Sequence, residues 1–75
     1  MKKMTEPIKI TLKMLRVGAG LTQAQCAEKV GVDPKTWGFW ESGKSLPKLD
    51  KAIEICKMFD IKLSELVFIL TKLTV

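Results

Sequence analysis

Apolar side chains recur at the three- and four-residue spacing of an amphipathic helix from Ile8 onward. This spacing predicts a helix over residues 7–17 that ends at Gly18. Residues 8–11 also alternate between apolar and polar side chains, as a short strand does. With that alternation, the helix would begin near Thr11 instead, and the pattern leaves both starts open.

Two short helices follow, joined by a very short link. Thr22 and Gln25 have the spacing of a capping box, which predicts a helix over residues 23–30. Gly31 suits the left-handed position that follows such a helix. An Asp-Pro pair then opens another helix over residues 34–42, since Asp is a good cap and Pro a good first helical residue. The link between these two helices, residues 31–33, is so short that it forces a sharp angle between them, which is typical of a helix-turn-helix.

The second half of the chain predicts two more helices. In the helix after Pro47, one apolar face is marked by Leu49, Ile53, Cys56 and Phe59 and widened by Ala52, Ile55 and Met58. Asp60 replaces the usual glycine at its end. In the last helix we expect Leu66 and Val67 to face inward. Residues 68–75 are too apolar for an exposed tail, so they either cover their own core, as a strand or helix extension, or form a dimer contact, which we favour.

Together these elements predict an all-α fold of five helices in one domain. The 75 residues leave room for little else. We divide them into a flexible arm at residues 1–6, the helix-turn-helix domain at residues 7–70 and an apolar tail at residues 71–75. A chain of this size keeps only about 4–11 kcal/mol of net stability, so a second subunit would help it and we expect a homodimer.

Charge and composition narrow the candidate partners and chemistries. Thirteen Lys and Arg against eight Asp and Glu give a net charge of +5, which favours nucleic acid first and an anionic membrane surface second. Without His or a Gly-rich phosphate loop, we expect no metal site, no cofactor and no enzyme activity. Cys26 and Cys56 are expected to be reduced, buried thiols of a cytoplasmic protein. The longest apolar run, residues 66–70, is too short to cross a membrane.

Residues 15–47, LRVGAGLTQAQCAEKVGVDPKTWGFWESGKSLP, resemble the lambda repressor and Cro-type helix-turn-helix family. Residues 61–68, IKLSELVF, are similar to the closing helix of that family. The resemblance covers most of the chain and implies that helix 34–42 enters the major groove of double-stranded DNA. It implies a sequence-specific transcriptional regulator, and we favour a repressor of the phage or prophage type that binds as a dimer.

The resemblance also implies roles for single residues. Arg16 and Glu41 match a family ion pair that ties the first helix to the third. Ala27 must be small where the two helices of the motif cross. The residues expected to face inward are Val30, Val32, Trp37 and Trp40. The residues expected to contact DNA are Gln23, Asp33, Pro34, Lys35, Thr36, Phe39, Ser42 and Lys44.

The outer side of helix 34–42 departs from the polar surface usual in this family. Lys35 can donate to guanine or phosphate, and Phe39 can pack on thymine methyl groups. Pro34 and Gly38 offer no side-chain hydrogen bond to a base. Because no Gln or Arg is placed for a bidentate contact, we expect specificity to depend on DNA shape and apolar contact.

Other functions share this fold and stay open. The same domain serves as an antitoxin or as a restriction-modification controller, and the sequence does not separate these from a repressor. A protein-interaction module, such as an antirepressor, would use Phe39, Trp40 and the apolar tail against a regulatory protein. Binding that weakens steeply with salt would favour DNA, whereas salt-insensitive binding to a protein would favour the module.

Overall fold

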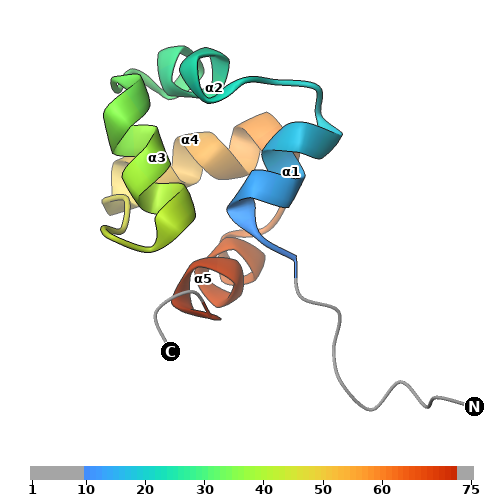
Figure 1. The fold of residues 1–75 in the computed structure, drawn as a ribbon. Helices are drawn as coiled ribbons and strands as arrows, with labels where there is room; N and C mark the ends of the chain where they lie inside the picture. The colour runs from blue at the N-terminus through green and yellow to red at the C-terminus, as the bar shows by residue number, and fades with distance from the viewer. Residues whose placement is uncertain (1–9, 73–75) are drawn as a thin grey trace, which may run out of the picture.

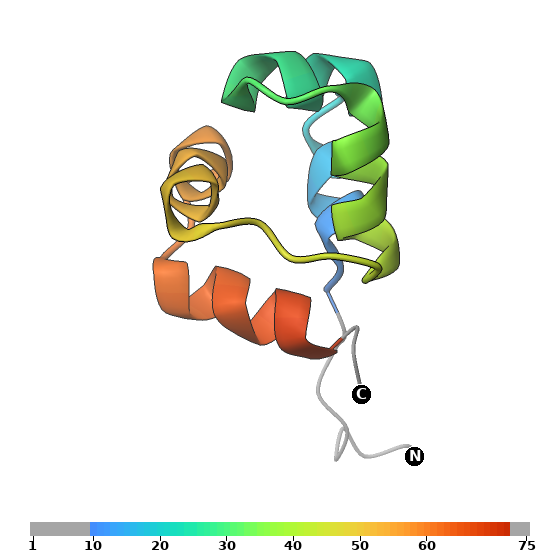
Figure 2. The same cartoon turned by 90° about the vertical axis from the view of Figure 1, so that its left-hand side faces the viewer.

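The computed structural model describes residues 10–72, which form five α-helices and contain no strand. The helices are α1 (Leu12–Gly18), α2 (Gln23–Val30), α3 (Pro34–Ser42), α4 (Leu49–Phe59) and α5 (Leu63–Lys72). Helices α2 and α5 lie at opposite ends of the domain, with α1, α3 and α4 between them (Figures 1 and 2). The all-α fold of five helices is therefore confirmed. The expected arm at residues 1–6 lies outside the described residues.

The helix-turn-helix has the predicted bounds because its ends are fixed by local hydrogen bonds. Thr22 and Gln25 form a reciprocal capping box, with backbone-to-side-chain distances of 2.8 and 3.1 Å. Gly31 ends α2 in the left-handed conformation, with φ at 77°. Asp33 Oδ1 accepts a hydrogen bond from the Thr36 backbone N–H at 3.0 Å and so caps α3.

Helix α1 has the shorter of the two predicted forms. Thr11 is its N-cap, and the Thr11 hydroxyl accepts from the Met14 backbone N–H at 3.1 Å. A helix from residue 7 is therefore wrong at residues 10 and 11, which also form no strand, while residues 7–9 lie outside the described part of the chain. The polar cap at Thr11 decides the start, because its hydroxyl satisfies a backbone donor of the first turn.

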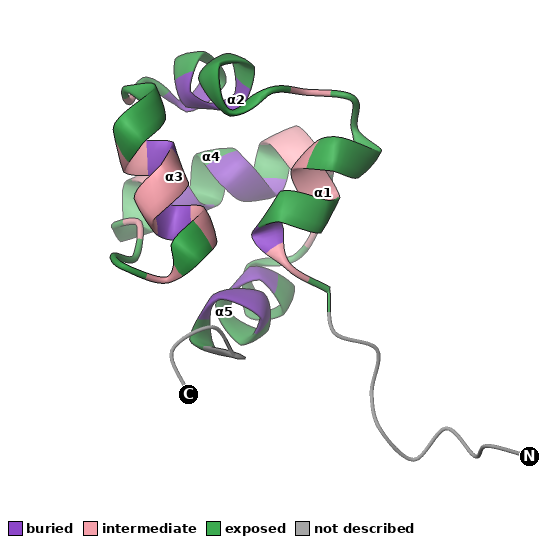
Figure 3. Cartoon of the chain, viewed as in Figure 1, coloured by how far each residue is buried: buried purple, intermediate pink, exposed green. Residues whose placement is uncertain are grey.

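One apolar core holds the helices together (Figure 3). Its buried members are Leu12, Cys26, Ala27, Val30, Trp37, Trp40, Ala52, Ile55, Cys56, Leu66 and Leu70. Trp37 is the largest of its fully buried side chains, with its ring centroid 5.6 Å from that of Trp40 and 6.5 Å from that of Phe59. Val32 is half-buried against this core. Burial raises the pKa of the Cys26 and Cys56 thiols, which therefore stay protonated.

The apolar faces of α4 and α5 differ in part from the prediction. Leu49 is 64% exposed and Val67 is 50% exposed, so the prediction that Val67 faces inward is wrong. The apolar stripes of both helices are broader than the surface available to cover them, and only one side of each stripe packs. In α5 that side carries Leu66, Ile69 and Leu70.

The apolar C-terminal segment continues α5 as far as Lys72. Ile69 and Leu70 are buried, so this part of the segment is a helix extension that covers its own core, not a strand. The domain limit that we expected at residue 70 falls inside α5. Phe68 is exposed, and residues 73–75 lie outside the described residues, so a dimer contact there stays a prediction.

Gly31→Ala is expected to destabilise the fold by about 1–2 kcal/mol, because a side chain at φ 77° is strained. The new Cβ would also lie 3.3 Å from Lys51 Nζ, which donates to the Val30 carbonyl at 2.8 Å. The matched control is Gly18→Ala, which meets nothing within 4 Å and should stabilise α1 by about 0.5 kcal/mol. Urea denaturation followed by circular dichroism measures both variants. Equal effects would contradict the role given to the turn.

Candidate nucleic-acid interface

The turn between α2 and α3 sets the two helices at a fixed angle. The backbone N–H of Val32 donates to the Ala27 carbonyl at 2.9 Å, which closes the turn. Ala27 is fully buried, as expected of a small residue in this motif. Trp37 and Trp40 fix the inner side of α3 in the core. The opposite side of α3 is therefore left at the surface (Figure 3).

A cluster centred on Glu41 joins α1, α2 and α3. Arg16 Nε donates to Glu41 Oε2 at 2.5 Å, and Arg16 Nη1 donates to the Leu21 carbonyl at 2.9 Å. The Trp37 indole N–H donates to Glu41 Oε2 at 2.6 Å, and Gln23 Nε2 donates to Oε1 at 3.0 Å. The Arg16 and Glu41 side chains are only 12% and 6% exposed. The expected ion pair thus forms part of a larger, largely buried cluster.

Burial alone would raise the pKa of the Glu41 carboxyl, but hydrogen bonds from Arg16, Gln23 and Trp37 outweigh burial and lower this pKa. A carboxyl whose pKa is lower in the folded state binds fewer protons there than in the unfolded chain. Its stabilising contribution is therefore present above the ordinary pKa of 4.5 and is lost as the pH falls through the folded value.

We expect the melting temperature of the wild type to fall on acidification below the ordinary carboxyl pKa of 4.5, because Glu41 takes up a proton as the pH falls through its lowered folded pKa. The Glu41→Gln variant should have a lower melting temperature than the wild type at neutral pH. Its melting temperature should fall less on acidification, because the amide at this position takes up no proton. Thermal melts from neutral to acidic pH measure both proteins. Parallel curves for the two proteins would contradict the assignment of this transition to Glu41.

The outer side of α3 carries most of the residues expected to contact DNA. Asp33, Pro34 and Lys35 are exposed, and Thr36 and Phe39 are half-buried. The ammonium groups of Lys35 and Lys44 lie over the Phe39 ring, 5.8 and 5.2 Å from its centroid. The structure therefore gathers two cations around one aromatic ring at this surface.

Two expected contact residues lie at the edges of this face. Ser42 is exposed at the end of α3, and its hydroxyl donates to the Phe39 carbonyl at 3.2 Å. Gln23 is exposed at the start of α2, but its amide nitrogen is held by Glu41. A Cβ at Gly38 would lie 3.9 Å from both polar atoms of that amide, so Gln23 lies next to Gly38. The structure thus brings Gln23 close to α3.

Sequence reasoning missed two contacts that position this face. It placed Gln23 among the residues that contact DNA and did not pair it with Glu41. It also missed Lys51 on α4, whose ammonium group binds the Val30 carbonyl at the end of α2. A lysine near a helix C-terminus is a favourable arrangement. This contact could not be predicted, because the sequence does not show that α4 passes the C-terminal end of α2.

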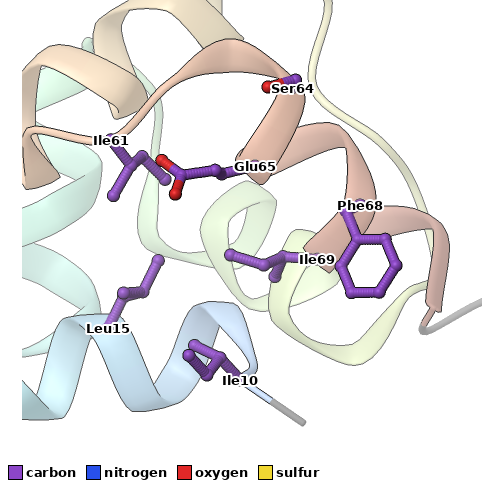
Figure 4. A pocket seen from close by; sticks show the side chains of 7 residues that line it. All are labelled: Ile10, Leu15, Ile61, Ser64, Glu65, Phe68 and Ile69. Atoms are coloured by element: carbon purple, nitrogen blue, oxygen red, sulfur yellow. The ribbon is translucent and has the colours of Figure 1, made fainter. Parts of the chain in front are cut away.

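The surface also has an apolar pocket away from the outer side of α3. Between α1 and α5 lies an apolar pocket of about 360 Å³, lined by side chains that include Leu15, Phe68 and Ile69 (Figure 4). In residues 10–72, no group of three or more His, Cys, Asp or Glu side chains is placed to hold a metal ion. No helix in that range has the length and apolar character needed to span a membrane.

Comparisons with known proteins agree with this architecture. The chain is similar to the HTH-type transcriptional activator BcrR of Enterococcus faecalis, 40% identical over 55 residues that cover 73% of this chain and 27% of BcrR. It is 34% identical to the uncharacterized HTH-type transcriptional regulator YobD of Bacillus subtilis over 50 residues, which cover 67% of this chain and 45% of YobD. The chain therefore spans less than half the length of either relative.

A third relative is covered almost in full. The uncharacterized HTH-type transcriptional regulator YgzD of Bacillus subtilis is 36% identical over 58 residues, 77% of this chain and 88% of YgzD. No solved structure gives a significant match. A model of the helix-turn-helix family matches residues 12–66, which include α1 to α4 and the capped turn between α2 and α3. The chain belongs to the lambda repressor and Cro-type helix-turn-helix family.

Proposed function

We propose that this chain is a sequence-specific DNA-binding transcriptional regulator that places α3 in the major groove of double-stranded DNA. One observation carries the proposal: the inner side of α3 is fixed by Trp37, Trp40 and Glu41, while its outer side presents Lys35 and Phe39. A net charge of +5 favours a polyanion. Membership of the family and the names of its relatives support the same function.

The contact residues divide into those that hold the backbone and those that face the bases. In this proposal, the phosphates are contacted by Gln23, Ser42 and Lys44, at the ends of the motif. At the outer side of α3, Lys35 reaches a base edge or a phosphate and Phe39 packs on thymine methyl groups. The remaining contact residues lie at the start of α3: Asp33, Pro34 and Thr36.

We further propose that the regulator is a homodimeric repressor of the phage type. Two copies would place their α3 helices in successive major grooves about 34–36 Å apart and so obstruct the polymerase. An apolar groove of about 270 Å³ between α4 and α5 supports self-association, and its walls include Leu49, Leu63 and Val67. An antitoxin or a restriction-modification controller would use DNA in the same way and would differ in its neighbouring genes.

Lys35→Ala is expected to weaken DNA binding and to make log K depend less on log salt concentration, with a slope smaller by about one. The charge-matched control is Lys57→Ala on α4, an exposed lysine in a depression that contains no α3 residue. Fluorescence anisotropy with duplexes selected from a randomised library measures both variants at several salt concentrations. Equal losses from Lys35→Ala and Lys57→Ala would contradict the placement of α3 against DNA.

A second function, binding of a regulatory protein without reading DNA, is favoured by the same apolar groove between α4 and α5. Such a module would select no duplex from the library even in dilute buffer. Its association with a protein would also be nearly insensitive to salt, because apolar burial and not charge would drive it. The library selection therefore separates the two functions.

A further inference from the structure

The outer face of α3 has an apolar centre with cationic edges. The Phe39 ring is half-buried, which limits its movement, and it stays accessible from solvent. Lys35 Nζ and Lys44 Nζ lie 5.8 and 5.2 Å from the ring centroid. An ammonium group over an aromatic face is attracted to it, so both lysines help to keep the ring in place. The same lysines can bind the phosphates that flank a base.

Around this ring, few polar groups are available to distinguish one base edge from another. Pro34 and Gly38 have no side-chain donor or acceptor. The Asp33 carboxylate already accepts from the Thr36 backbone N–H, and the Ser42 hydroxyl already donates to a carbonyl. The outer side of α3 and its N-cap therefore present no pair of fixed polar atoms for a bidentate base contact, and the neighbouring Gln23 amide already donates to Glu41.

We propose that Phe39 recognises the C5 methyl group of a pyrimidine in the major groove and that 5-methylcytosine therefore substitutes for thymine at that position. This inference rests on the proposed DNA-binding function. In the major groove, thymine differs from cytosine by its methyl group and by an O4 acceptor in place of an N4 donor. Where no fixed group reads O4 or N4, or the edge of the paired purine, the methyl group alone decides. Binding to DNA then responds to cytosine methylation.

The test uses duplexes that the wild-type protein selects from a randomised library. At each thymine of the selected site, four duplexes are compared, carrying thymine, deoxyuridine, cytosine or 5-methylcytosine. At the position that Phe39 contacts, loss of the methyl group should weaken binding about fourfold, the effect of exposing one buried methyl group. The change from cytosine to 5-methylcytosine should restore about the same factor.

The Phe39→Ala variant should bind thymine and deoxyuridine equally at that position, whereas Phe39→Leu should keep part of the difference. The series on the wild-type protein needs no variant and stays informative if a variant does not fold. Equal binding of thymine and deoxyuridine at every position would overturn the inference and leave the DNA-binding function intact. The inference would also be overturned if the duplex with 5-methylcytosine bound as weakly as the duplex with cytosine. If no duplex is selected at all, the proposed function itself fails.

Discussion

Glu41→Ala is expected to destabilise the protein by about 3–5 kcal/mol, a large part of the stability of a domain of this size. The change removes the acceptor for Arg16, Trp37 and Gln23 at once. It leaves the Arg16 guanidinium, with a side chain only 12% exposed, without its carboxylate. Urea denaturation at neutral pH, followed by circular dichroism, measures the loss.

Two controls separate this cluster from a general effect of removing a charge. Glu54→Ala removes an exposed carboxylate from α4 and should change the stability little. The double variant Arg16→Met with Glu41→Leu should be more stable than Glu41→Ala, because it leaves no buried charge unpaired. A loss below about 1 kcal/mol for Glu41→Ala would mean that the pair behaves as a solvent-exposed one.

The helix-turn-helix could be predicted to the residue because its limits are encoded locally. The hydroxyl of Thr22 and the carboxylate of Asp33 each bind a backbone N–H three residues later, and Gly31 adopts φ 77°. None of these interactions depends on a distant part of the chain. Fixed spacing within a few residues therefore suffices to define α2, the turn and α3.

The packing of α4 and α5 could not be predicted in the same way. Their sequences show broad apolar stripes, and periodicity alone does not say which part of a stripe meets the core. Ala52 and Ile55 are buried in α4 while Leu49 is exposed, and α5 buries Leu66 but exposes Val67. The rotation of each helix about its axis depends on its neighbours, which only the three-dimensional structure provides.

The surface position of the candidate residues on α3 could be predicted from the sequence, but the contacts among them could not. Lys35 and Phe39 lie on the outer side of α3, where the motif places them, but the position of Lys44 over the Phe39 ring depends on the loop after α3. Gln23 belongs both to the expected DNA surface and to the Glu41 cluster. The contact between Gln23 and Glu41 links the surface proposed to bind phosphate to the cluster that holds α1 against α3.

Trp37→Ala is expected to destabilise the fold by about 3–5 kcal/mol, as the loss of a large buried aromatic side chain does. Trp37 is fully buried, and its ring lies next to those of Trp40 and Phe59. Trp37→Phe keeps most of this packing and removes the indole N–H that donates to Glu41 at 2.6 Å. A hydrogen bond to a charged group contributes about 1.5–3 kcal/mol, so Trp37→Phe should lose about that amount.

The same substitution in the Glu41→Gln background distinguishes the hydrogen bond from the packing of the ring. If the bond to the carboxylate matters, Trp37→Phe should lose less in that background than in the wild type, and the difference is the coupling energy between Trp37 and Glu41. Trp40→Phe makes a similar change of ring size in the same core and should show little coupling to Glu41. Additive losses for Trp37 and Glu41 would mean that packing alone holds α3 at the angle that presents Lys35 and Phe39.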